Sequence, residues 1–113
     1  MTPGELYWVE FPPANGHEQS GRRPAVVLQD DPYAGGLAVV FVIPVTGSLR
    51  NLRYPATVRI PPSDANGLLV ESVALVYQAR AIDRQRIGNR IGVVEPAVVA
   101  QIREALDRLT GRP

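Results

Sequence analysis

The length, composition and charge of the chain exclude several classes of protein. Its 113 residues suffice for one modest hydrophobic core and not for two, so we expect a single domain over residues 1–113. A net charge of +1 and 45% hydrophobic residues are ordinary for a soluble globular protein. With no cysteine and a single histidine, disulfides and thiolate zinc sites are excluded, and we expect no tightly held transition metal and no cofactor.

The distribution of apolar residues predicts the location of the protein in the cell. No apolar run reaches the length of a membrane span, and the N-terminus lacks a basic region followed by an apolar stretch. We therefore expect a cytoplasmic protein that does not contact a membrane.

Short apolar segments separated by turn residues predict a series of β-strands. Each is rich in β-branched or aromatic residues and is bounded by proline, glycine or small polar residues. The expected strands cover residues 6–11, 25–29, 37–43, 56–60 and 72–77. Residues 30–36 read as a turn or excursion, Pro44 to Ser48 as the end of the third strand, and Ser63 to Gly67 as a further turn.

A polar loop over residues 15–24 separates the first two expected strands. It contains the only histidine, His17, beside the carboxylate Glu18, and ends in the adjacent arginines Arg22 and Arg23. Hairpin connections usually need only about two to five residues. A longer loop with an acid, a base and phosphate-binding groups is a candidate functional site, and the alternative is an ordinary mobile surface loop.

The last segment has helical periodicity. Apolar residues recur at helical spacing from residue 98 to residue 109, Pro96 suits the first turn and Gly111 suits the stop. We expect a helix over residues 95–110. Strands in series with one terminal helix predict a mainly β (α+β) protein, a strongly curved antiparallel sheet or small barrel with the helix laid against it.

All twelve basic residues are arginines, which form bidentate hydrogen bonds to phosphate. Genome composition explains the missing lysines better than function does. Seven of the arginines lie in the middle of the chain, where only three acidic residues oppose them, and this clustering is compatible with nucleic-acid binding. The seven are Arg50, Arg53, Arg59, Arg80, Arg84, Arg86 and Arg90.

Four segments spread over nearly the whole chain carry a resemblance to a known family. They are GELYWV at residues 4–9, GHEQSGRRPAVVL at 16–28, VIPVT at 42–46 and QARAIDRQRI at 78–87. In order and spacing they resemble the successive signatures of the MazF/PemK family of toxin endoribonucleases.

The resemblance implies a fold, an activity and partners. The fold is a small SH3-like barrel of the CcdB/MazF type with a C-terminal helix, assembled as a homodimer. The activity is metal-independent, sequence-specific cleavage of single-stranded messenger RNA, which inhibits translation and growth. The family's reaction leaves 2′,3′-cyclic phosphate and 5′-hydroxyl ends. The toxin is neutralised by a cognate, MazE-like antitoxin with an acidic disordered tail that folds on binding.

The resemblance also implies the catalytic residues. Arg23, immediately before a proline, matches the catalytic arginine, and Thr46 matches its hydroxyl partner. Glu18 matches the loop carboxylate, and His17 matches a histidine present in some members. RNA contacts are expected from Gln19, Arg22, Ser48, Arg53, Tyr77, Gln78, Arg80 and Arg86.

Each assignment has a structural alternative. Arg22 rather than Arg23 could be the working arginine, and Thr46 could cap a turn. Glu18 could organise the loop through its backbone. Gln78, together with Arg80, could tie the loop to the sheet. Arg84, Arg86 and Arg90 are also compatible with a solvated basic rim.

One position departs from the family pattern. Many members carry an aspartate just before the glutamine of the last motif, and this chain has Tyr77 there. A base for the reaction would then come from Glu18 or His17, while Tyr77 could stack on a nucleobase. Two other functions stay open: a non-catalytic gyrase poison, because the CcdB toxins share this fold, and an inert nucleic-acid-binding barrel.

Overall fold

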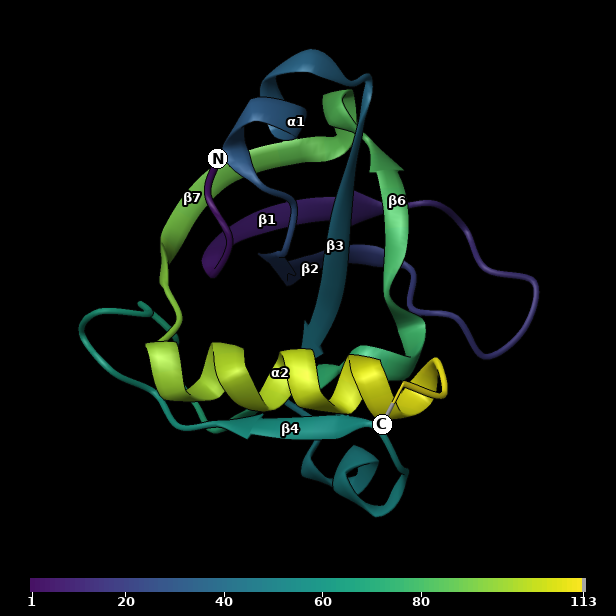
Figure 1. Cartoon of the computed structure of the whole chain (residues 1–113). Helices are drawn as coiled ribbons and strands as arrows, with labels where there is room; N and C mark the ends of the chain where they lie inside the picture. Colours follow the sequence, from purple (N-terminus) through teal and green to yellow (C-terminus); the bar gives the residue numbers. More distant parts are fainter. Residues whose placement is uncertain (113) are drawn as a thin grey trace.

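The computed structural model describes residues 1–112, apart from the side chains of Asp31 and Ala34. It contains one curved antiparallel sheet with a long helix packed against it (Figure 1). The strands are β1 (Glu5–Phe11), β2 (Gly21–Val27), β3 (Val39–Thr46), β4 (Thr57–Ile60), β5 (Ser72–Leu75), β6 (Arg80–Asp83) and β7 (Ile87–Val93). The α-helices are α1 (Asp31–Gly36) and α2 (Pro96–Leu109), and short 3₁₀ turns form η1 (Leu49–Arg53), η2 (Val76–Gln78) and η3 (Arg84–Arg86).

The strand order of the seven-stranded sheet is β4-β5-β3-β2-β1-β7, and β6 pairs with β3 away from this path. The sheet bends so that β1, β2, β3 and β6 enclose an interior (Figure 1). The predicted antiparallel, mainly β architecture is confirmed. Among the described residues no pairing joins β4 to β7, the two edge strands of this order. The sheet is therefore strongly curved but not closed, and the term barrel applies to it only in a loose sense.

β2 begins earlier than the sequence predicted. It pairs with β1 as far as Phe11↔Gly21, because β1 extends to Phe11 and offers a partner there. Arg22 and Arg23 therefore lie in a strand rather than in the loop, and the predicted start at Ala25 was wrong. A strand fixes the direction in which each arginine points, since successive side chains face opposite sides of the sheet.

β3 runs through the proline that was expected to end it. On one edge of β3, β6 pairs up to Val42 and β5 pairs from Val45. Pro44 falls between these two partners, where a residue without an N–H is more easily accommodated. β3 consequently ends at Thr46 rather than Ile43.

The structure contains elements that the sequence did not reveal. Residues 31–36 form the short helix α1 instead of a turn, β5 ends at Leu75 before the 3₁₀ turn η2, and β6 and β7 were missed. β7 carries glycine and asparagine and exposes most of its side chains, so it lacks the alternation of a half-buried strand. Its Gly92 has a structural role, because a Cβ there would lie 2.5 Å from the carbonyl oxygen of Ala65.

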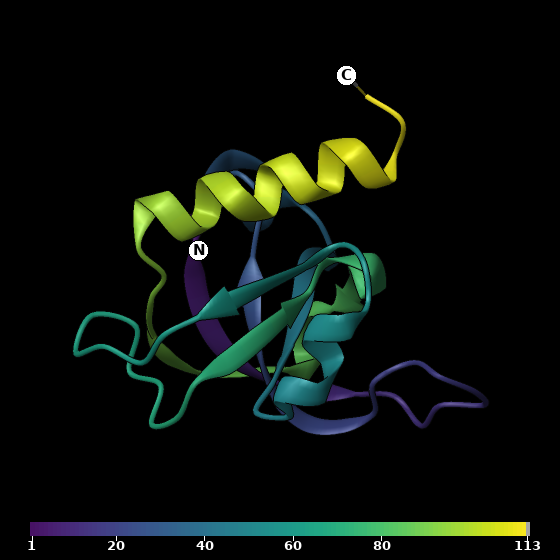
Figure 2. The same cartoon turned by 90° about the horizontal axis from the view of Figure 1, so that it is seen from below.

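The helix predicted over residues 95–110 is confirmed as α2. Its buried Ile102, with Val98, Val99 and Leu106, packs on a core cluster that includes Val26, Ile43, Val45 and Ile60. Figure 2 shows α2 lying across one side of the sheet and the β1–β2 loop projecting on the other. Within residues 1–112 no helix is both long and apolar enough to cross a membrane.

A second cluster fills the inside of the curve between β1, β2, β3 and β6. Its members include Phe11, Ala25, Val42 and Ile82. The β1–β2 loop begins directly after Phe11, so it leaves the sheet at the edge of this cluster.

A buried asparagine holds the turn before β5 against the start of α2. Asn66 is 0% exposed; its Oδ1 accepts hydrogen bonds from the backbone N–H groups of Ser63 and Leu68. Its Nδ2 donates to the carbonyl of Pro61 and to Glu95 Oε1, and the Ser63 hydroxyl donates to Glu95 Oε2 at 2.6 Å. The bond from Ser63, with those from the backbone and Asn66, lowers the pKa of Glu95.

Replacing Asn66 by alanine is expected to destabilise the protein by about 2 kcal/mol, because it leaves the partly buried N–H groups of Ser63 and Leu68 without acceptors. Urea denaturation at pH 7 measures this loss. Since the folded-state pKa of Glu95 is lowered, the stabilisation from its hydrogen bonds is present at pH 7 and is lost as pH falls through that lowered pKa.

Asp64→Ala is the matched control, because Asp64 is exposed on the same turn and its removal should change stability by less than about 0.5 kcal/mol. If Asn66→Ala and the wild type unfold at the same urea concentration, the role assigned to Asn66 is wrong.

Candidate active site

The pairing of β2 with β3 sets the strand ends that carry Arg23 and Thr46 side by side. The ladder joins Ala25↔Pro44, Val26↔Ile43 and Val27↔Val42. The same register continued by two residues places Arg23 opposite Thr46. Directly opposed residues of an antiparallel pair point to the same face, so the two side chains share one end of the sheet interior.

The Arg23 side chain is held from one side only. It is half-buried, and its Nε donates a 3.0 Å hydrogen bond to the carbonyl oxygen of Ser20. Among the groups that the structure describes, its two terminal nitrogens have no further hydrogen-bond partner. A guanidinium anchored through Nε is preorganised to present those nitrogens to a phosphate.

Thr46 is only 7% exposed. Its Oγ1 accepts a 3.2 Å hydrogen bond from the backbone N–H of Ser48, so Thr46 does cap the turn that follows β3, as its structural alternative predicted. The capping bond uses the oxygen as an acceptor and leaves the hydroxyl hydrogen for donation. The turn therefore orients a donor near Arg23.

Gln78 fastens the β1–β2 loop to the rest of the molecule. Its Oε1 accepts a 2.7 Å hydrogen bond from the backbone N–H of Gln19, and its Nε2 donates to the carbonyl oxygen of His17 at 3.1 Å. Both bonds join segments about sixty residues apart. Gln78 thus ties the loop to the sheet, as the alternative interpretation of the sequence predicted.

A surface pocket of about 400 Å³ lies between this loop and η2. The loop carboxylate Glu18 lines it together with Gln78 and Arg80. The Arg80 guanidinium carbon lies 5.6 Å from the centroid of the Phe11 ring, so the edge of the inner core supports this cation. In the same loop, Gln19 Oε1 is buried without a hydrogen-bond partner in the described chain.

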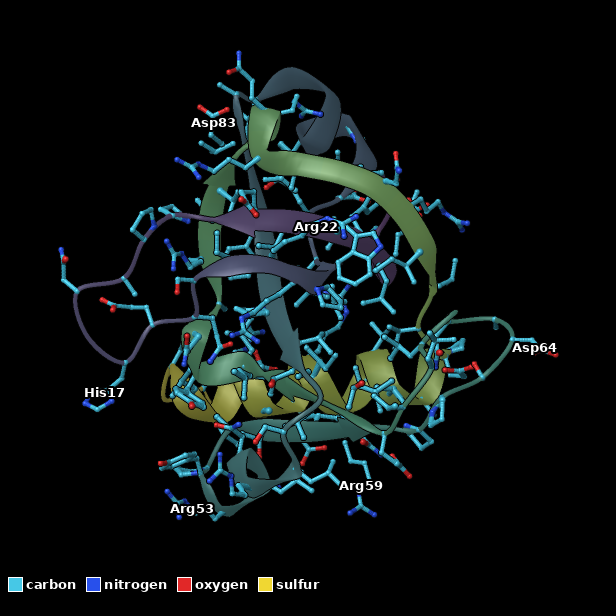
Figure 3. All side chains as sticks on the ribbon, turned by 180° about the vertical axis from the view of Figure 1, so that it is seen from behind. His17, Arg22, Arg53, Arg59, Asp64 and Asp83 are labelled. Carbon is cyan, nitrogen blue, oxygen red and sulfur yellow. The ribbon has the colours of Figure 1, made fainter. Side chains whose placement is uncertain are left out.

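His17 is placed differently from the other loop residues. Its backbone carbonyl takes part in the clamp, while its imidazole is exposed at the outer end of the loop and points away from the sheet (Figure 3). The structure therefore does not bring the His17 side chain together with Arg23 and Thr46.

Arg22 lies on the opposite face of β2 from Arg23. Its guanidinium stacks on Trp8, 4.3 Å from the ring centroid. It shares a separate pocket of about 200 Å³ with Arg86, which donates to the carbonyl oxygen of Glu10. Strand alternation thus distinguishes the two adjacent arginines, and Arg23 is the one that lies near Thr46.

A third pocket, of about 220 Å³, lies over η1. It is lined by Ser48, Arg50, Asn51, Arg53 and Tyr54. Tyr77 faces the same region, because its ring centroid lies 6.0 Å from that of Tyr54. The sequence analysis did not single out Tyr54 as a candidate site residue. The only feature that could have indicated it is its position directly after Arg53.

The arginines that cluster in the sequence spread over the molecule. Arg50 and Arg53 line the pocket over η1, whereas Arg86 lines the pocket of Arg22, and Arg53 lies well apart from Arg22 (Figure 3). Arg84 donates to the carbonyl of Leu37. Arg90 pairs with Glu5 at 2.6 Å. Burial of Glu5 acts to raise its pKa, but the contact with Arg90 and the hydrogen bonds from Thr2 lower the pKa overall. Among the described side chains, which leave out Asp31, no group of three or more His, Cys, Asp or Glu is arranged to hold a metal ion.

Comparison with known proteins places this geometry in a family. The model of PemK-like, MazF-like toxins of type II toxin–antitoxin systems matches residues 2–110. The chain belongs to this family. The resemblance noted in its four sequence motifs is confirmed.

Relatives of the MazF/PemK family match the chain over almost its full length. The endoribonuclease MazF9 of Mycobacterium tuberculosis is 36% identical over 111 residues, which cover 94% of this chain and 92% of that protein. The endoribonuclease toxin MazF of Escherichia coli is 33% identical over 109 residues, covering 96% and 92%.

Solved structures of the family have the same fold. MazF of Deinococcus radiodurans superposes with a TM-score of 0.84 at 34% identity, covering 98% of this chain and 96% of that one. The MazF chain of a MazE–MazF complex from that organism gives a TM-score of 0.79 at 33% identity, covering 100% and 97%.

Gln78→Ala is expected to release the loop while the sheet stays folded. Without the Oε1 acceptor, the amide of Gln19 loses its 2.7 Å hydrogen bond, and local opening of the loop should speed its exchange. Hydrogen exchange followed by NMR measures this at single amides. Gln85→Ala, at an exposed glutamine of η3, is the control. Unchanged protection of the Gln19 amide in Gln78→Ala would show that something else holds the loop.

Proposed function

We propose that this MazF/PemK family toxin cleaves single-stranded RNA at a centre formed by Arg23 and Thr46. The observation that supports the proposal is the β2–β3 register, because its continuation by two residues sets the half-buried guanidinium of Arg23 against the hydroxyl of Thr46, beside the loop held by Gln78. The curated relatives named endoribonucleases support the reaction class. The substrate would be messenger RNA in the cytoplasm.

The proposed reaction is an internal transfer at one phosphorus atom. The ribose 2′-oxygen loses its proton and forms a bond to the neighbouring phosphorus, while the bond from phosphorus to the 5′-oxygen breaks. The leaving 5′-oxygen takes up a proton, which the protonated base returns through solvent. The products are a 2′,3′-cyclic phosphate and a 5′-hydroxyl, and the step consumes no water or metal ion.

Three groups divide this chemistry. Arg23 would stabilise the negative charge that grows on the phosphorane oxygens. Thr46 would donate its free hydroxyl hydrogen to one of these oxygens. Glu18 would act as the base, because it lines the pocket beside Gln78, whereas the His17 imidazole points away.

A gyrase poison or an inert nucleic-acid-binding barrel would not require this arrangement. Binding alone calls for no guanidinium anchored through Nε and no capped hydroxyl opposite it. The pairing of Arg23 with Thr46 therefore favours catalysis over either alternative.

We also propose a homodimer, with its contact beside the reacting centre. Leu69 and Val70 are 94% and 59% exposed, at the edge of a largely apolar pocket of about 220 Å³. The pocket is lined by Trp8, Pro24 and Thr46 among others. Exposed apolar side chains gathered in this way mark interaction surfaces. A second copy that packs on Leu69 and Val70, and not on the part of the pocket lined by Thr46, would lie beside the proposed centre and leave Thr46 open to RNA.

A cognate antitoxin is proposed as the inhibitor. Solved relatives include a MazE–MazF complex. An acidic disordered tail would be attracted to the pocket near Arg23 and Arg80 for the same reason as RNA phosphates, and an extended segment can cover a long groove. Antitoxin and RNA would then compete for overlapping sites.

Arg23→Ala is expected to lower the cleavage rate about 100-fold or more, because a charge that stabilises the transition state is lost. Thr46→Ala should be nearly as damaging. Cleavage of a long RNA in EDTA, followed by end analysis of the fragments, measures both the rate and the chemistry. Arg59→Ala is the control, since Arg59 is exposed on β4 and distant from the loop (Figure 3). If Arg23→Ala keeps more than about a tenth of the wild-type rate, another group supplies the charge.

The dimer contact predicts that one charge at Leu69 separates the subunits. Light scattering should give about twice the 12.3 kDa chain mass for the wild type and a single chain mass for Leu69→Glu, because a charge would be buried at the interface. Leu109→Glu, at an exposed leucine near the end of α2, should stay dimeric. A dimeric Leu69→Glu would place the contact elsewhere.

A further inference from the structure

Two tyrosines from separate segments meet on the surface near the clamped loop. Tyr54 follows η1, and Tyr77 lies in η2. Their ring centroids are 6.0 Å apart, with an angle of 57° between the ring planes. Tyr54 is 42% exposed and Tyr77 is 36% exposed, so the pair is not part of the core.

Hydrogen bonds to their backbone groups hold the main chain of both tyrosines in place. The N–H of Tyr77 donates to the carbonyl of Ala56, and the hydroxyl of Thr57 donates to the carbonyl of Tyr54 at 2.9 Å. The N–H of Tyr54 donates to the carbonyl of Asn51. These ties join both tyrosines to the start of β4, and a rigid aromatic surface loses little entropy when a ligand stacks on it.

An arginine extends the aromatic pair. The Arg53 guanidinium carbon lies 5.0 Å from the centroid of the Tyr54 ring, and Arg53 donates a 2.9 Å hydrogen bond to the Tyr54 hydroxyl. The order along the surface is therefore a cation, a first ring and a second ring. Arginine planes and tyrosine rings are the groups on which unstacked bases of single-stranded RNA pack.

Each tyrosine lines a different polar pocket. Tyr77 lines the pocket of about 400 Å³ that also contains Glu18, Gln78 and Arg80. Tyr54 lines the pocket of about 220 Å³ that contains Arg50 and Arg53. The tyrosine pair thus stands between the pocket that contains Glu18, the proposed base, and a pocket with two guanidinium groups, which suits a phosphate.

We infer that Tyr54 and Tyr77 form a nucleobase-stacking platform that holds the RNA strand next to the cleaved bond. The inference rests on the proposed ribonuclease function. A base beside the reacting phosphate would stack on the pair, and the adjoining phosphate would enter the pocket of Arg50 and Arg53. Because every base has a stacking face, the platform contributes affinity at this position without selecting one base.

The test uses a short single-stranded RNA with a 2′-deoxy substitution at the cleaved position, so that it binds without being cut. 2-Aminopurine replaces one base at a time, since its fluorescence falls when it stacks. We expect quenching at one position next to the deoxy sugar. Tyr77→Leu and Tyr54→Leu should relieve that quenching and weaken binding about 5- to 100-fold, whereas Tyr77→Phe keeps the ring and should bind like the wild type.

Steady-state kinetics provide a second readout. A stack present in both the ground state and the transition state raises KM and leaves kcat unchanged when it is removed. Tyr33→Leu is the control, because Tyr33 is 64% exposed on α1, and circular dichroism checks that each variant is folded. If the Tyr77→Leu variant quenches 2-aminopurine fluorescence and binds the RNA as the wild type does, the platform is wrong.

The outcomes separate this inference from the proposed function. If the wild type cleaves RNA and the tyrosine variants match it in KM and quenching, the platform is wrong and the ribonuclease assignment stands. If the RNA stacks on the tyrosines but the natural strand is never cleaved, the platform stands and the assignment fails. Failure of the wild type to bind the RNA at all would overturn the platform.

Discussion

The antiparallel register between β2 and β3 is the constraint on which the candidate site depends. Pairs from Ala25↔Pro44 to Val27↔Val42 are buried on both strands, and a slip by one residue would turn each of these side chains to the other face. The burial of Val27 and Val42 therefore also fixes which residue stands opposite Thr46. Packing of the core and geometry of the site are set by the same ladder.

The rest of the site is attached to this ladder by a few polar contacts. Strand alternation sends Arg23 toward Thr46 and its neighbour Arg22 onto Trp8, so two identical side chains have different surroundings. Gln78 then holds the loop across the open end of the sheet interior. Its two hydrogen bonds go to backbone groups, which makes the loop position independent of the loop side chains and leaves Glu18 facing the pocket.

Much of the fold could be predicted from the sequence because its signals are local. Hydrophobic periodicity located β1, the central strands and α2, and the family motifs located Arg23 and Thr46. The errors arose where tertiary pairing overrides local preference. Gly21 is in a strand because Phe11 pairs with it, Pro44 is tolerated in a gap between two partner strands, and β7 exists because β1 offers an edge.

The site itself was less accessible to sequence reasoning. No pattern within one segment shows that Gln78 binds the backbone of residues 17 and 19, or that Tyr54 meets Tyr77. These contacts join residues that are far apart in the chain, and only the folded sheet brings them together. The arginine cluster shows the opposite effect, because arginines that are close in the sequence lie on separate surfaces of the folded protein.

The central claim is that Arg23 and Thr46 act on one phosphoryl group. Single-turnover cleavage by Arg23→Ala, Thr46→Ala and the double variant tests it most directly. Residues that stabilise the same transition state as a unit are strongly non-additive, so the double variant should cleave about as slowly as the slower single variant. Rate losses that multiply in the double variant would show that the two side chains act independently, and would contradict the account.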